Sequence, residues 1–419
     1  MSFPFILVAA VILVSAMASY LNYKIFRFSN SIGITFASLL ISTTVIICLK
    51  FFPAAFIPIK TILSGIDFHS VIIDGMLGYL LFAAALHINT VDFKKQLSPI
   101  ILLASIGVIC STILIGFFLY WVSHLLNSPI SIFYCFLFGA LISPTDPIAV
   151  VSVFKTTKSI PKKVKSRILG ESLFNDATGI ILFVILYQIV TNTADNITFK
   201  YVLTMSIREV FGAILLGAIL GKFVSFLLRD VDDRKVAVLI TLALTTAGYL
   251  FAVELGTSAP IMMVISGLII GHDMRKGHYP KRTSLYLNSF WELWDDILNT
   301  ALFVLIGLEV FEADFHVKYL IIAFTTFLAI VIIRYVILFI PSVHKKRLNF
   351  RKYYWKENLL MSWGAIRGGI SIALALSIQT FEGVTTIFTI TYYVVLFSIF
   401  IQGSTFKWLV LKLFPETNK

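Results

Sequence analysis

The sequence predicts an all-α, polytopic membrane protein with about thirteen transmembrane helices, two of them broken, and three observations lead to this prediction. Hydrophobic residues make up 58% of the 419 residues and charged residues only 13%, whereas soluble domains are about one quarter charged. Apolar runs recur from one end of the chain to the other, each near the ~20 residues that span a bilayer as a helix. Two of these runs, in opposite halves of the chain, are interrupted by prolines or glycines next to charged residues.

The thirteen predicted spans follow one another with only short segments between them. No segment is long enough to fold as a separate soluble domain, so we expect residues 1–419 to form a single transmembrane domain in the lipid bilayer. The span at 258–272 is short, and the span at 130–154 contains the prolines. The predicted spans lie at approximately 4–22, 31–49, 68–90, 99–124, 130–154, 166–191, 206–228, 235–253, 258–272, 288–310, 318–340, 357–379 and 385–411.

Lysines and arginines are concentrated in alternate loops between the apolar runs. Such loops remain on the cytoplasmic side of a membrane. We therefore expect a cytoplasmic C-terminus and, with thirteen spans, an N-terminus outside, in a cytoplasmic (inner) membrane. Residues 16–18, Ala-Met-Ala, resemble a signal-peptidase site, but no basic residue precedes the apolar segment. The first helix is expected to be retained.

The charge distribution and the motifs disfavour other classes of function. The net charge of +12 is spread over short loops, so we do not expect nucleic-acid binding. Cys48, Cys110 and Cys135 lie within apolar runs and lack the spacing of metal ligands. The sequence contains no zinc-protease motif, phosphate-cradling glycine loop or nucleophile–base pattern. We therefore expect neither enzyme activity nor a cofactor.

The first of three polar clusters inside the membrane is Ser143-Pro144-Thr145-Asp146-Pro147, in the fifth span. Two prolines three residues apart break a helix and leave backbone groups free, which a membrane protein tolerates only beside other protein or a water-filled cavity. Asp146 is suited to cap the second half-helix through its exposed amides, and a contact with an ion remains open for it. Thr145 offers a hydroxyl group and a freed carbonyl oxygen.

The second cluster lies in the sixth span. Ser172 and Asp176 are four residues apart and share one helical face, while Glu171 and Asn175 share the neighbouring face. A hard cation needs several oxygen ligands, one or two of them anionic, and Thr145 of the broken helix would complete such a set. We predict an ion site centred on Asp176, against the alternative of a purely structural polar contact between helices.

The third cluster, at residues 363–369 in the twelfth span, contains three glycines and Arg367. Glycines permit unwinding or close approach, and an arginine that stays charged must meet a carboxylate, carbonyl groups or water. Arg334 in the eleventh span has the same requirement. Glu171 is the natural buried partner for one of these two arginines, and we favour Arg334. Two interrupted helices in opposite halves predict an inverted-repeat transporter with its site at the membrane midplane.

These clusters resemble the three signature stretches of the cation:proton antiporter-1 family. The matching segments are Ser143–Val150, Gly170–Gly179 and Trp363–Ser371, and within the family the chain is similar to the NhaP-type sodium/proton antiporters of prokaryotes. The similarity covers essentially the whole chain, including the stretch Phe290–Glu309. It implies exchange of Na⁺, or also Li⁺, for H⁺ in pH homeostasis.

The resemblance further implies a homodimer built on two groups of helices. Core helices would lie at approximately 99–191 and 318–411, and dimer-interface helices at approximately 1–90 and 206–310. The broken fifth and twelfth spans would cross where they unwind.

For the site, the resemblance implies that Asp176 carries both the ion and the proton. Thr145 and Ser172 would be ligands of the transported Na⁺, Asn175 would brace the helix crossing, and an ion pair would join Glu171 to an arginine in the eleventh span, for which Arg334 is the match. Our hypothesis is that Na⁺ and H⁺ compete for Asp176, which gives electroneutral one-for-one exchange.

One departure from the family pattern affects ion selectivity. Some NhaP-type members carry a glutamate in the third span, where this chain has alanines within residues 81–87. A potassium/proton antiporter is therefore the main alternative, and a cation channel is a distant one.

Overall fold

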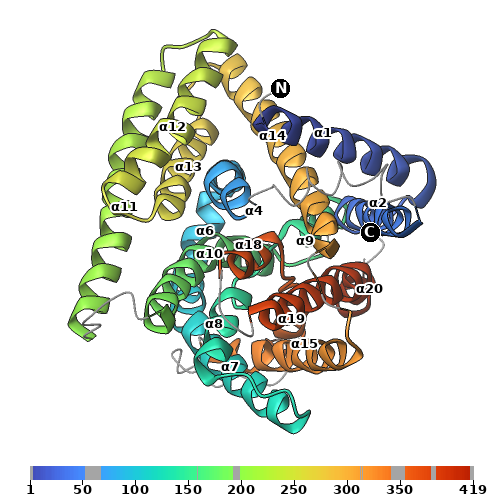
Figure 1. The fold of residues 1–419 in the computed structure, drawn as a ribbon. Coiled ribbons are helices and arrows are strands. Elements are labelled where there is room, and N and C mark those ends of the chain that lie inside the picture. Colours follow the sequence, from blue (N-terminus) through green and yellow to red (C-terminus); the bar gives the residue numbers. More distant parts are fainter. Residues whose placement is uncertain are drawn as a thin grey trace.

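The computed structural model describes residues 3–51, 68–157, 159–191, 199–311, 313, 315–340, 354–378 and 384–415. Over these ranges the chain folds into helices and forms no β-strand, apart from an isolated bridge between Asp146 and Ile366 (Figure 1). The predicted all-α class is confirmed.

Up to the end of the sixth predicted span, the described residues form nine α-helices and three π-helices. These are α1 (Phe3–Leu21), η1 (Asn22–Phe26), α2 (Asn30–Phe51), α4 (Phe68–Ser70), η2 (Val71–Met76), α5 (Leu77–His87), α6 (Thr90–Leu102), η3 (Leu103–Gly107), α7 (Val108–Leu125), α8 (Ile132–Ile142), α9 (Ile148–Thr156) and α10 (Lys162–Thr191).

The second half continues with four long helices before its own interrupted span. Its described elements are α11 (Phe199–Leu228), α12 (Arg234–Glu254), α13 (Ala259–Arg275), α14 (Lys281–Leu308), η4 (Glu309–Phe311), α15 (Val317–Ile337), α17 (Tyr354–Trp363), α18 (Gly369–Leu376), α19 (Val384–Phe397), η5 (Ser398–Gly403) and α20 (Ser404–Leu413).

Each of the thirteen predicted spans coincides with one helix or with a run of successive helices in the described residues. Nine described segments are long and apolar enough to cross a membrane. Some edges differ from the prediction: α6 begins at Thr90 rather than near 99, and α14 at Lys281 rather than near 288. Hydropathy detects only the apolar part of a helix, whereas α6 begins where the Asn89 side chain accepts hydrogen bonds from two amides of its first turn.

The helices gather around two large apolar clusters. One is formed mainly by α7, α8, α15 and α19, and the other mainly by α5, α12 and α13. Figure 1 shows α11, α12 and α13 together on one side of the molecule, and α7, α8, α15 and α19 on another. The long helix α14 runs from the side of α12 and α13 toward α9, and it packs against α1, α2, α5 and α12 and reaches α18.

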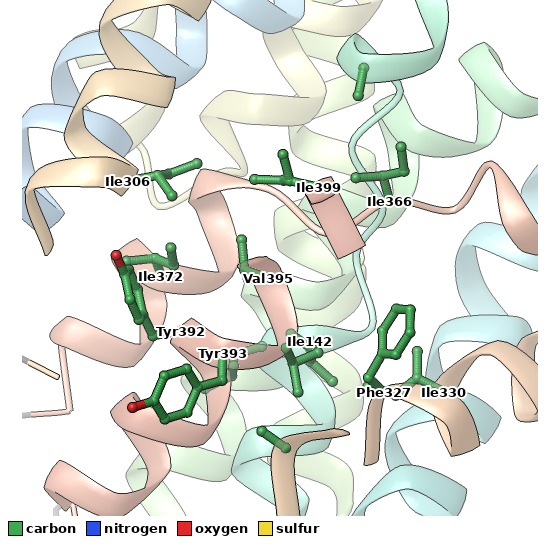
Figure 2. Packing of buried hydrophobic residues seen from close by; sticks show 14 of the residues in the cluster. Ile142, Ile306, Phe327, Ile330, Ile366, Ile372, Tyr392, Tyr393, Val395 and Ile399 are labelled. Carbon is green, nitrogen blue, oxygen red and sulfur yellow. The ribbon is translucent and has the colours of Figure 1, made fainter. Parts of the chain in front are cut away.

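Both predicted helix breaks are present. Helix α8 ends at Ile142 and α9 begins at Ile148, while α17 ends at Trp363 and α18 begins at Gly369. The two extended segments pass each other, and the Asp146 amide donates a hydrogen bond of 2.7 Å to the Ile366 carbonyl. Figure 2 shows Ile366 at this crossing above the apolar side chains of Ile142 and Val395.

Close packing of α8 against α7 holds the first half of the broken fifth span. A Cβ atom at Gly139 would lie 2.3 Å from the carbonyl oxygen of Thr112, and a backbone atom cannot move aside as a flexible side chain could. Only glycine therefore fits at this position.

Replacing Gly139 with alanine should destabilise the protein by about 1–3 kcal/mol through overpacking. The measurement is the unfolding temperature of the purified protein in detergent, followed by tryptophan fluorescence. Gly75→Ala is the matched control, because the nearest atom to its added Cβ lies 3.8 Å away. Equal losses of stability in the two variants would contradict the proposed packing.

Candidate ion-binding site

The crossing of the two broken helices satisfies backbone groups that their prolines and glycines set free. Asp146 Oδ1 accepts a hydrogen bond of 2.9 Å from the Ile148 amide in the first turn of α9. The same side chain fills the space beside Gly368, where an added Cβ would lie 2.1 Å from Asp146 Oδ2. Asp146 thus joins the start of α9 to the extended segment before α18.

Helix α10 contacts the break through two polar side chains. Ser172 Oγ donates a hydrogen bond to the Thr145 carbonyl oxygen, and Asn175 Nδ2 donates one of 2.7 Å to Thr145 Oγ1. All three side chains are buried. The structure therefore brings the oxygens of the broken fifth span and of α10 together, one turn from Asp176.

Asp176 is only 7% exposed, yet no described residue donates a hydrogen bond to its carboxylate. It lines a cavity of about 620 Å³ together with Thr145, Asp146 and Ser172. The cavity extends to His87, at the end of α5 that precedes the basic residues of α6. The carboxylate is thus removed from bulk water but open to a cavity that a small cation could enter.

The cation ligands available at this point are one carboxylate and several neutral oxygens. Among the described residues, no three His, Cys, Asp or Glu side chains are placed to hold a metal ion together. Strongly bound divalent ions take several carboxylates. The local donor set therefore suits a weakly held monovalent cation.

A buried ion pair lies beside the crossing. Arg334 Nη2 on α15 contacts Glu171 Oε1 on α10, and their side chains are 7% and 2% exposed. Arg367, the other arginine that the sequence offered as a partner for Glu171, donates hydrogen bonds to backbone groups instead. Its Nη1 donates hydrogen bonds of 2.6 Å and 2.7 Å to the carbonyl oxygens of Ser143 and Pro144. Arg367 thus binds backbone oxygens that the proline break leaves without helical partners.

Two polar side chains of the thirteenth span support the second break, and the sequence reasoning missed both. Ser398 Oγ accepts a hydrogen bond of 2.9 Å from the Arg367 amide, and Gln402 Nε2 donates one of 3.0 Å to the Trp363 carbonyl. Ser398 also donates to Gln402 within the π-helix η5. The signal in the sequence was a serine and a glutamine four residues apart in an otherwise apolar span.

Replacing Arg334 with leucine should destabilise the protein by about 3–5 kcal/mol, because the Glu171 carboxylate is left buried without its partner. The double variant Glu171→Gln/Arg334→Leu should recover much of this loss. The unfolding temperature in detergent measures both effects. A single variant as stable as the wild type would show that the pair does not hold α10 to α15.

Comparisons with known proteins agree with this geometry. The family model described as "Sodium/hydrogen exchanger, transmembrane" matches residues 8–412. The Na(+)/H(+) antiporter NhaP of Pseudomonas aeruginosa is 37% identical over 416 residues, covering 97% of this chain and 96% of that protein. The Na(+)/H(+) antiporter NhaH of Halobacillus dabanensis is 32% identical, covering 83% of this chain and 84% of that protein.

A solved structure has the same fold. The sodium proton antiporter MjNhaP1 from Methanocaldococcus jannaschii superposes with a TM-score of 0.75 at 20% identity, covering 99% of this chain and all of that chain. The family model and the relatives span nearly the whole sequence, including the two breaks and α10. The chain therefore belongs to the sodium/hydrogen exchanger family of membrane transporters.

Proposed function

We propose that this protein exchanges Na⁺ for H⁺ across the cytoplasmic membrane at a single site centred on Asp176. One observation carries the proposal: Asp176 is buried, receives no hydrogen bond from the described residues and lines a cavity beside a broken helix. The antiporter names of the relatives support the choice of ions. Transport would proceed by alternating access, in which the cavity opens to one side of the membrane at a time.

Three residues would hold the transported cation. Asp176 supplies the charge, while Ser172 Oγ and the oxygens of Thr145 supply neutral ligands. The Ser172 hydroxyl donates its proton to the Thr145 carbonyl, which leaves lone pairs on both oxygens for a cation. Asn175 fixes the Thr145 hydroxyl, and Asp146 contributes negative charge nearby while it caps α9.

The formal charges at the crossing explain why exchange should be electroneutral. Asp146 and Glu171 carry two negative charges, and Arg334 and Arg367 carry two positive charges, so these four cancel. The net charge then depends on Asp176 alone, and either Na⁺ or H⁺ brings it to zero. Alternating access would therefore move an equally neutral core with either cargo.

The organisation of the protein in the membrane is part of the same proposal. Core helices at about 99–191 and 318–411 would move against helices at about 1–90 and 206–310, through which two copies would form a homodimer. Large apolar side chains are exposed along α11, which suits contact with lipid or with a second copy. The basic loops would place the C-terminus in the cytoplasm and the N-terminus outside.

Replacing Asp176 with asparagine should abolish Na⁺-driven proton movement, because the amide keeps the shape but carries no negative charge and takes up no proton at working pH. The assay uses proteoliposomes with an internal pH dye. Asp74→Asn is the matched control, since Asp74 is exposed on η2 and is not among the residues that line the cavity. Transport activity retained by Asp176→Asn would contradict the proposal. Comparing the transport rates with Li⁺, Na⁺ and K⁺ distinguishes a sodium/proton from a potassium/proton antiporter.

Competition for one carboxyl group predicts a specific pH dependence. As the pH falls into the range where Asp176 is protonated, the apparent KM for Na⁺ should rise by up to about tenfold per pH unit, because each proton bound excludes a cation. The maximal rate at saturating Na⁺ should change much less. Initial rates at several pH values, with the membrane potential clamped at different values, test this. A KM independent of pH, or a rate that follows the voltage, contradicts electroneutral competition.

A further inference from the structure

One face of α14 is polar along the cavity that contains Asp176. The lining residues of this helix occur at intervals of three or four residues or next to one another, which places them on one helical face. The face spans thirteen residues, with about 18 Å of helix between the first and the last. Its members are Asn288, Glu292, Asp295, Asp296, Asn299 and Thr300.

The cavity carries an excess of negative charge. Five carboxyl groups line it, three of them on α14, and its described lining residues include neither lysine nor arginine. A cleft lined by one sign of charge raises the local concentration of counter-ions. The negative electrostatic potential of these carboxylates would attract any cation, but it does not by itself make a binding site.

Asn299 provides the second, independent observation. Its side chain is only 7% exposed and lines the cavity, yet its Oδ1 accepts no hydrogen bond from the described residues. A buried amide oxygen without a donor is destabilising unless another group satisfies it. Asp295 and Asp296 lie four and three residues earlier, within side-chain reach on the same face.

The arrangement suits a hydrated monovalent cation. No three acidic, His or Cys side chains in the described part of the chain converge as a chelated divalent ion would require. Thr300 Oγ1 donates its proton to the Asp296 carbonyl, at 2.8 Å, so the lone pairs of its hydroxyl oxygen remain as further acceptors beside Asn299. Two carboxylates, an amide oxygen and water can surround such an ion without stripping its hydration shell.

We propose that Asp295, Asp296 and Asn299 form an outer binding site for a hydrated monovalent cation, which the ion occupies before it reaches Asp176. This outer site lies on α14, which packs against α2 and α5, whereas Asp176 lies on α10. The destination of the ion rests on the proposed function. Occupancy of the outer site does not.

Binding of radioactive ²²Na⁺ to the purified protein tests occupancy without transport. In the Asp176→Asn background, a weak Na⁺ site should remain, and the added changes Asp295→Asn and Asp296→Asn should remove it. Asp232→Asn is the matched control, because this aspartate is exposed and is not among the residues that line the cavity. If Asp176→Asn alone abolishes all Na⁺ binding, the outer site is overturned.

Transport kinetics in the otherwise wild-type protein test the role of the site. Asp295→Asn/Asp296→Asn should raise the KM for Na⁺ roughly tenfold while leaving the maximal rate unchanged. Asn299→Leu, which alters no charge and conserves volume, should also raise the KM. A different result would refute the specific site: only the charge variants raise the KM, and added choline chloride abolishes the difference from the wild type. The carboxylates would then attract Na⁺ only through their long-range electrostatic potential.

The two proposals fail in different ways. If the binding assay detects no outer site while the Asp176→Asn variant is inactive in transport, only the inference about α14 is refuted and the exchange mechanism stands. Conversely, an active Asp176→Asn variant refutes the exchange mechanism, while the binding assay still decides whether α14 holds a cation.

Discussion

The need to satisfy backbone groups inside the membrane is the constraint on which the rest of this structure depends. Two helices stop within the bilayer, and lipid offers no hydrogen bonds to their free ends. The protein supplies partners from the opposite break: the Asp146 amide bonds the Ile366 carbonyl, and Arg367 bonds the carbonyls of Ser143 and Pro144. The crossing is therefore held mainly by charged and backbone groups, and Ser172 and Asn175 join it to α10, the helix that carries Asp176.

This arrangement separates charges that brace the fold from the charge that can change. Glu171 is paired with Arg334, Arg367 is bound to carbonyl oxygens, and Asp146 caps α9. Asp176 alone among these buried charged groups receives no hydrogen bond from the described residues. A group held by strong partners would exchange its proton or cation only at the expense of those partners. The unsatisfied carboxylate can instead take either cargo from the cavity, which is why we assign the exchange to it.

Much of the fold could be predicted from the sequence because each of its determinants is local. Apolar runs near the length of a bilayer indicated the spans, and prolines beside Asp146 and glycines beside Arg367 indicated the breaks. Contacts between residues far apart in the sequence were harder to predict. The sequence could not assign Arg367 to the carbonyls of Ser143 and Pro144, because that contact depends on how two distant segments cross. Ser398 and Gln402 were missed since polar residues within a helix are also compatible with simple helix–helix contacts. The polar face of α14 lies within the predicted span at 288–310, but which side of that helix borders the cavity depends on how distant helices pack.

The central claim is that a cation and a proton exclude each other at Asp176. Its most direct test is the number of protons released when Na⁺ binds to the purified protein in detergent, obtained by calorimetry in buffers of different ionisation enthalpy. Below the pH at which Asp176 loses its proton, our mechanism predicts that about one proton is released for each Na⁺ bound at this site, and that Asp176→Asn abolishes the release. Binding of Na⁺ to the wild-type protein without proton release at any pH would contradict it.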